Sequence, residues 1–404
     1  MLLAVSWRNI WRNKKRSVII LMSIAIGLVG GMLTIGFANE MVASMIKNGI
    51  ETKYSHVQIH HPDLSKDYDV NLTIPNGHAI YETIKKRTDV RAVSHRVVSP
   101  VMISSPTGSY GLMVYGVIPD EEKKTTKISQ SMVEGNYLRD DQKNSIIISK
   151  KMADQLKVKL GSKVRLTLQN KNHDLTAGSF RVRGLFKTSD GTYDINAVFV
   201  NQKDLSDLIE LNDEFHEMTL MTINDEHADS LTADLQREFP GIKIESWRQV
   251  APELDLMKSM TKNTLYIVLG IIMLALMFGI TNTMLMSVLD RTRELGVLMA
   301  IGMNRSKVFG MIVVETIFLS MTGGLLGSFL TWLLLGLLGY TGIDLSFWSE
   351  GLSAFGSSTI LYPHVQPDSY LTLSLMMIAT SIIAAIYPAF KAIRLNPATA
   401  IRTY

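Results

Sequence analysis

Four long runs that are almost free of charge restrict the folds open to this sequence of 404 residues. The runs cover residues 17–38, 264–289, 308–338 and 370–388, and Glu315 is the single charged residue within them. Because an α-helix rises about 1.5 Å per residue, about 20 apolar residues cross the hydrocarbon core of a bilayer. The sequence therefore predicts a polytopic α-helical membrane protein with four transmembrane helices, and its apolar fraction of 47% agrees with that class.

Residues 39–263 form one long insert between the first and second predicted helices. Strand-like runs occur at 56–60, 92–104, 111–119, 144–149, 163–169, 180–186, 197–201, 218–224 and 242–247, and helical periodicity at 149–157, 202–210 and 228–239. The insert is long enough to bury a core of its own. It is predicted to be a large α+β domain in two lobes.

Residues 1–16 combine an apolar stripe with a cluster of basic residues. Leu3, Trp7, Ile10 and Trp11 share one face of a helix, which is typical of an amphipathic helix in the membrane interface. A plain basic flank of the first span is the alternative interpretation. The apolar run that follows is longer than a signal-peptide core and has no convincing small-residue cleavage motif, so we predict an uncleaved anchor.

Basic residues near the span ends predict the orientation, because short basic segments stay on the cytoplasmic side. The N-terminal arm, the turn 290–307 and the tail 389–404 are basic, whereas the loop 339–369 contains no Lys or Arg. Long domains cross largely regardless of charge. The termini and the turn are therefore expected in the cytoplasm, with the insert and the loop on the other side.

Small residues recur every four positions in two of the predicted spans, at Gly27 and Gly31 and at Gly323 and Gly327. Such spacing allows close helix packing, within the chain or across a dimer, although ordinary glycine use is an alternative in the first span. Glu315 lies eight residues into the third helix, where we interpret it as an interhelical hydrogen-bonding residue, with gating or proton relay as the alternative. Four helices leave little room for an enclosed channel, so we expect a dimer.

Several kinds of chemistry lack support in the sequence. No phosphate-binding G-x-x-x-x-G-K-[ST] loop and no H-E-x-x-H motif occurs, and no catalytic residues stand out. His56 and His60 would share one face of a strand, but too few carboxylates accompany them to predict a metal site. The sequence contains no cysteine, and its net charge of +4 is too small to predict nucleic-acid binding.

The turn 290–307 concentrates charge and two glycines between two long apolar runs. Together with its flanks at 282–308, with Glu315 and with the glycines at 323–327, it resembles the membrane permease module of the MacB/LolC/FtsX class of ABC transporters. Residues 387–402 are similar to the C-terminal signature of that class. Residues 135–138, 146–161 and 180–194 are similar to the extracytoplasmic domain of lipoprotein-releasing permeases.

This resemblance implies a subunit of the bacterial inner membrane that works as a dimer with an identical or related permease chain. The insert would be periplasmic, with a membrane-proximal lobe at about 41–118 plus 213–263 and an inserted lobe at about 119–212. ATP and Mg would be bound by separate cytoplasmic ATPase subunits, so this chain is expected to be no enzyme and to hold no cofactor. The expected ATPase-coupling residues are Arg291, Arg293, Glu294, Leu295, Gly296, Met299, Ala300, Gly302 and Arg305.

Two departures narrow the resemblance. MacB proteins carry a fused ATPase that this chain lacks, and FtsX proteins have a much smaller outer domain. Extraction of lipoproteins from the inner membrane is therefore the preferred function, with a periplasmic lipoprotein carrier or adaptor and membrane lipids as further expected partners. MacB-like export of peptides, drugs or other small molecules and FtsX-like activation of an envelope hydrolase are the alternatives.

Overall fold

The computed structural model describes residues 6–8, 12 and 14–394, which divide into two compact units. The membrane unit comprises the described parts of Met1–Glu40, Lys258–Ile343 and Leu361–Tyr404. The globular unit comprises Met41–Met257 and Asp344–Ile360. Leu3, Ile10 and Trp11 of the predicted interfacial helix lie outside the described residues, as does most of the tail 389–404.

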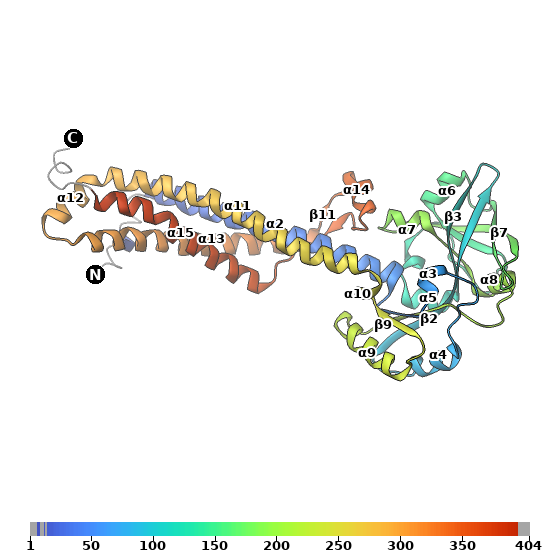
Figure 1. The fold of residues 1–404 in the computed structure, drawn as a ribbon. Coiled ribbons are helices and arrows are strands. Elements are labelled where there is room, and N and C mark those ends of the chain that lie inside the picture. The colour runs from blue at the N-terminus through green and yellow to red at the C-terminus, as the bar shows by residue number, and fades with distance from the viewer. Residues whose placement is uncertain (1–5, 9–11, 13, 395–404) are drawn as a thin grey trace. The chain divides into compact units, whose positions relative to one another are not determined.

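Four helices within the described part of the chain are long and apolar enough to cross a membrane (Figure 1). They are α2 (Lys14–Gly49), α11 (Pro252–Asp290), α13 (Arg305–Thr341) and α15 (Pro367–Ile393). At 36 and 39 residues, α2 and α11 are about 54 and 58 Å long, which exceeds a hydrocarbon core of about 30 Å. Both helices therefore continue well past the apolar runs that predicted them, from the membrane unit into the globular unit.

The four helices bury a shared apolar core within the membrane unit. Side chains at helical spacing supply this core, because residues three or four apart lie on one face of a helix. Its members include Ile24, Leu28 and Met32 of α2, Leu269 and Met273 of α11, Met311, Ile312 and Leu319 of α13, and Leu373 and Met377 of α15.

One ten-stranded sheet organises the globular unit, in the order β10-β1-β9-β2-β3-β8-β5-β7-β4, with β6 joining β2 and β7. The strands are β1 (Val57–His60), β2 (Val90–Ser105), β3 (Gly108–Val117), β4 (Met132–Gly135), β5 (Ser145–Ser149), β6 (Lys163–Gln169), β7 (Leu175–Phe186), β8 (Ala197–Asn201), β9 (Glu217–Thr222) and β10 (Lys243–Ser246). Each predicted strand coincides with one of them; β4 was not predicted. The predicted α+β class is the one observed.

Strand β2 joins the two expected lobes into one sheet. Its first half pairs with β9, and its second half pairs with β3 and β6. Strand β3 in turn pairs in parallel with β8 of the expected inserted lobe. The strand just before the expected boundary near residue 118 therefore pairs with strands of both expected lobes.

Short helices cover the sheet and complete the core. They are α3 (Leu64–Asp67), α4 (Gly77–Lys85), α5 (Pro119–Thr125), α6 (Lys150–Leu156), α7 (Gly191–Asn196), α8 (Gln202–Ile209), α9 (Ala228–Glu238) and α10 (Trp247–Val250). Where β2, α5 and β9 meet, the buried guanidinium of Arg96 binds Glu122 through two nitrogens, at 2.7 and 2.9 Å, and Glu217 at 2.9 Å. Such paired charges tolerate burial because each satisfies the hydrogen bonds of the other.

The expected outer loop 339–369 is partly ordered into α14 (Ser349–Ala354) and the paired strands β11 (Ile343–Asp344) and β12 (Ile360–Leu361). Within the globular unit, Nδ2 of Asn48 donates to the carbonyl of Gly356 at 2.9 Å and to Oγ of Ser358 at 3.1 Å. The backbone of Ser358 also donates to Oγ of Ser44. The loop is therefore fastened to the part of α2 that extends into this unit.

Candidate functional site

The turn 290–307 contains its own helix, α12 (Thr292–Ala300). Gly302 ends this segment with φ +99°, a left-handed conformation that favours glycine. Asn304 then begins α13, because its side chain accepts a hydrogen bond from the backbone of Ser306 at 3.2 Å. Local sequence chemistry therefore sets both ends of the connection between α12 and α13.

Helix α12 has an inward and an outward face. Leu295 is 3% exposed and joins the core of the membrane unit, with Leu298 and Met299 packed against that core. On the other side, Val297 and Ile301 are 39% and 81% exposed. Large apolar side chains presented to solvent beside charged residues are typical of an interaction surface.

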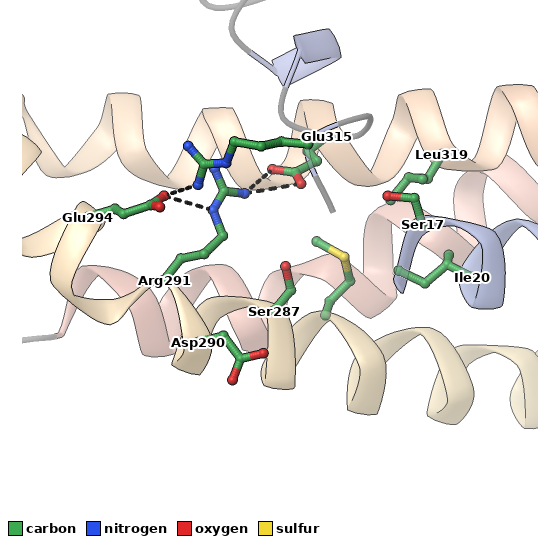
Figure 2. Close-up of a pocket in the computed structure, with 10 residues that line it drawn as sticks. Ser17, Ile20, Ser287, Asp290, Arg291, Glu294, Glu315 and Leu319 are labelled. Carbon is green, nitrogen blue, oxygen red and sulfur yellow. Dashed lines mark hydrogen bonds and ion pairs between the residues drawn. The ribbon is translucent and has the colours of Figure 1, made fainter. Parts of the chain in front are cut away.

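An ion-pair network fixes α12 to the neighbouring helices (Figure 2). Nη1 of Arg291 lies 3.2 Å from both carboxylate oxygens of Glu315 in α13, and Nε of Arg291 lies 3.3 Å from Glu294. Glu294 also pairs with Arg12, which precedes α2. The Arg12 guanidinium, with Arg291, holds the pKa of Glu294 below its usual range, so this network weakens as the pH falls and the carboxylate is protonated.

The network borders a polar cavity of about 260 Å³ within the membrane unit. It is lined by Arg12, Ser17, Ile20, Met284, Ser287, Asp290, Arg291, Glu294, Glu315 and Leu319 (Figure 2). The side chains of Glu315 and Arg291 are only 8% and 17% exposed, so the pair is largely removed from water. A buried pair of this kind suits a mechanical link between helices, because breaking a buried ion pair is costly.

The glycines predicted as packing sites lie against other helices of the same chain. A Cβ at Gly27 would lie 2.7 Å from Leu276 of α11, and one at Gly31 would lie 3.4 Å from Leu269. A Cβ at Gly323 would lie 2.8 Å from Ile24, and one at Gly327 would lie 3.0 Å from the Cα of Ala25 in α2. These close approaches place α2 directly against α11 and α13.

The residues predicted to couple to an ATPase separate into two groups. Arg291, Leu295, Gly296 and Met299 face partly or wholly inward and support α12, whereas Arg293, Glu294, Ala300, Gly302 and Arg305 are exposed. Arg12, Val297 and Ile301 were not predicted from the sequence as residues of this site. The basic character of residues 1–16 was the one signal available for Arg12. Val297 and Ile301 could not be recognised because apolar residues of this segment face both the core and the solvent.

The two histidines considered as metal ligands have protein partners instead. His56 accepts a hydrogen bond from the backbone of Thr222 at 3.0 Å, and Nε2 of His60 lies 3.0 Å from Glu245. In the part of the chain that the structure describes, no group of three or more His, Cys, Asp or Glu side chains is arranged to hold a metal ion. Both histidines are therefore held by hydrogen bonds within the protein.

Two family models match the chain. The model for the MacB-like periplasmic core domain matches residues 17–238, which is more than half of the chain, and the model for the FtsX-like permease C-terminal region matches residues 266–397. The first match begins in α2 and covers most of the globular unit, and the second covers most of α11, α12, α13 and α15.

Curated relatives match over most of their length. The chain is 24% identical over 286 residues to the lipoprotein-releasing system transmembrane protein LolC of Haemophilus influenzae, covering 69% of this chain and 67% of the relative. It is 20% identical to LolC of Neisseria meningitidis, covering 97% of this chain and 96% of the relative. It is also 20% identical to LolE of Haemophilus influenzae, covering 99% of both chains.

Solved structures of extracytoplasmic domains are similar to part of this chain, with low TM-scores. The periplasmic region of MacB from Actinobacillus actinomycetemcomitans matches with a TM-score of 0.36 and 15% identity, covering 54% of this chain and 98% of that one. The extracellular domain of the transporter YknZ from Gram-positive bacteria matches with a TM-score of 0.34 and 16% identity, covering 47% of this chain and 99% of that one.

The matches to the two family models show that this chain belongs to the MacB-like and FtsX-like family of ABC transporter permeases, with a periplasmic domain between its first and second membrane helices.

Proposed function

We propose that this permease couples ATP hydrolysis by a separate ATPase to the extraction of lipoproteins from the inner membrane. The observation that carries the proposal is the end-to-end match to LolC and LolE, which are named as transmembrane proteins of lipoprotein-releasing systems. An ABC permease implies an ATPase partner and a second permease chain. A soluble carrier that receives the lipoprotein would complete the assembly.

The outward face of α12 is the proposed docking surface for the ATPase, on the cytoplasmic side. It presents Arg293, Val297 and Ala300 of α12 to solvent, together with Ile301 just after α12 and Arg305 at the start of α13. Ile301 would supply a central apolar contact, since it is 81% exposed, and the two arginines would form a polar rim. This arrangement supports a partner interface at the turn where the sequence predicted one.

Movement of α12 would be passed to α13 through two contacts. Leu295 is buried in the core of the membrane unit, and Arg291 holds Glu315 of α13. Both contacts resist separation, one because it would expose apolar surface and the other because it would take an ion pair from a buried carboxylate. A force applied to the outward face would therefore move α12 and α13 together.

Helices α2 and α11 would carry that movement to the periplasmic domain. They pack closely in the membrane unit, where Gly27 of α2 faces Leu276 of α11. They also pack in the globular unit, where a Cβ at Gly49 would lie 3.2 Å from Leu254. A pair of unbroken helices is stiff enough to act as a lever, because every interior peptide group is hydrogen-bonded along the axis.

Export of a small molecule by a MacB-like machine is the second candidate. A stretch of 145 residues is 32% identical to the pyoverdine export ATP-binding/permease protein PvdT of Pseudomonas fluorescens, although it covers only 35% of this chain and 19% of that one. The shared permease architecture would serve either cargo. The two candidates differ in what leaves the membrane and in the partner that receives it.

Reconstitution separates the two candidates. The chain would be purified with its cognate ATPase and second permease chain, placed in proteoliposomes that contain a fluorescent lipoprotein, and supplied with ATP and a soluble carrier. The proposal predicts ATP-dependent transfer of the lipoprotein to the carrier, and none with an ATPase subunit unable to hydrolyse ATP. Absence of transfer, combined with co-purification of a periplasmic adaptor and export of a small molecule, would replace the first candidate by the second.

A further inference from the structure

A second cavity, of about 330 Å³, lies in the membrane unit near the end of α13 and the start of α15. Its size falls at the lower end of the range for small-molecule sites, about 300–1,000 Å³. It is lined by Trp332, Leu335, Gly336, Gly339, Tyr362, Pro363, His364, Val365 and Tyr370. None of these residues belongs to the ion-pair site at the other end of the helices.

Two glycines keep one wall of this cavity open. Gly336 and Gly339 lie on the same face of α13, together with Leu335. A Cβ at Gly336 would meet no atom within 4 Å, and one at Gly339 would meet only the carbonyl of Pro363, at 3.9 Å. Any larger side chain at these positions would project into the hollow.

The opposite wall is held in place by α2. A Cβ at Gly36 would lie 3.1 Å from Val365, so the segment after β12 packs tightly against that helix. One turn along α2, Oε2 of Glu40 lies 3.1 Å from Nδ1 of His364. The cavity is therefore an open hollow between α13 and a segment packed against α2, with a polar group at its rim.

The position of the cavity determines which molecules can reach it. It lies at the end of the spans that leads into the periplasmic domain, and its border residues Trp332 and Tyr362 are 65% and 48% exposed. Leu333 and Leu337 of α13 are 55% and 60% exposed, which fits a surface that faces lipid. Tryptophan and tyrosine are enriched where hydrocarbon meets headgroups.

We propose that this cavity holds an acyl chain of a phospholipid from the periplasmic leaflet, with the lipid headgroup beside His364. An empty hollow forfeits dispersion contacts along its walls. Leu335, Pro363 and Val365 give part of the lining an apolar surface against which an acyl chain can pack. His364 is 67% exposed on its side chain and can donate a hydrogen bond to a phosphate oxygen at the rim. The bound lipid is a component of the membrane and is distinct from the proposed cargo.

Photolabelling of the full chain tests this assignment. The permease, with its partner subunits, would be reconstituted in vesicles containing phosphatidylethanolamine that carries a diazirine in one acyl chain. After irradiation, mass spectrometry should find labels concentrated on residues 332–339 and 362–365. Gly336→Leu, which fills the hollow, should reduce that labelling several-fold. Gly279→Leu, at another exposed helical glycine with no atom within 4 Å of its Cβ, should leave it unchanged.

Three outcomes would overturn the assignment. Labels spread evenly along the exposed faces of α11 and α13 would mean that the cavity holds no lipid preferentially. Labelling unchanged in both Gly336→Leu and the second filling variant Gly339→Leu would mean that the chain lies elsewhere. Loss of the label when an unlabelled lipoprotein is added would assign the cavity to the cargo. Because labelling needs no ATP, these results are independent of whether the chain releases lipoproteins.

Discussion

Removal of the Arg291 side chain is the sharpest perturbation of the proposed link between α12 and α13. In Arg291→Gln, the side chain of Glu315, which is 8% exposed, loses its ion pair with the guanidinium of Arg291. Breaking a buried pair by removing one partner costs about 3–5 kcal/mol. A single nitrogen of Arg291 contacts both oxygens, at 3.2 Å, so the contact is weaker than a pair joined through two nitrogens. We therefore expect about 3 kcal/mol of destabilisation.

Thermal unfolding of the purified chain, followed by intrinsic tryptophan fluorescence, measures this effect. The double variant Arg291→Gln/Glu315→Gln removes both charges of the pair and should recover part of the lost stability, because the buried carboxylate that loses this guanidinium is removed with it. Arg293→Gln removes a charge from an exposed neighbour and should change stability by less than about 0.5 kcal/mol. These two variants separate the loss of the ion pair from a general effect of charge removal.

Equal melting temperatures of Arg291→Gln and Arg293→Gln would refute a stabilising role of the ion pair. A double variant no more stable than Arg291→Gln alone would refute it as well. In either case the pair would not hold α12 to α13, and the proposed path of force would need another contact.

Three further predictions concern other parts of the chain. Ile301→Asp should abolish co-purification of the ATPase without lowering the melting temperature of the chain. Leu175→Asp, at a residue 78% exposed in the periplasmic domain, should leave co-purification intact. Equal binding of the ATPase by both variants would exclude α12 as the docking surface. Gly327→Leu should lower the free energy of unfolding by about 1–3 kcal/mol, because its Cβ would press on the backbone of Ala25 at 3.0 Å. Gly310→Leu, whose Cβ would meet no atom within 4 Å, should lower it by less. Burial lowers the pKa of His95 to about 4, so the contribution of this neutral histidine to folding stability is fully present above pH 6.5 and is lost as the pH falls toward 4. Thermal unfolding at pH 5 should therefore show about 2 kcal/mol less stability than at pH 7 from this group, and His95→Phe should remove that part of the difference.

The membrane helices could be predicted from the sequence because an apolar run of about 20 residues without charge is rare outside transmembrane helices. Their full lengths could not. Glu40 and Lys47 lie in the part of α2 beyond the apolar run, and Glu253 and Lys258 lie in the corresponding part of α11. A helix continues through such residues when tertiary packing supports it, and hydropathy carries no information about that support.

The strands of the periplasmic domain could also be predicted, but their partners could not. Alternation and β-branched residues reveal that a segment is extended, whereas pairing depends on contacts far apart in sequence. Strand β2 is the clearest case, since one run of 16 residues pairs with β9, β3 and β6. Strand β4 escaped prediction because its four residues, Met132–Gly135, are too few to establish a pattern.

The candidate site shows the same division. Charge density identified the turn 290–307, and burial cost identified Glu315 as a residue that needs a partner. The sequence could not reveal that this partner is Arg291, which lies 24 positions earlier in the chain. Nor could it reveal that Leu295 faces the core while Val297 faces solvent, because a nine-residue helix offers too few turns to fix its rotation.

The most direct test of the central claim is a distance measurement between the membrane unit and the periplasmic domain during ATP hydrolysis. Because the chain contains no cysteine, Leu175→Cys and Tyr340→Cys would add two spin labels at residues that are 78% and 89% exposed. Double electron–electron resonance on the reconstituted assembly, diluted with unlabelled chain, would compare the ATP-free state with the state trapped by ATP and vanadate. The account predicts a shifted distance distribution that is lost in the Ile301→Asp variant. Identical distributions in both states, in an assembly that hydrolyses ATP, would contradict it.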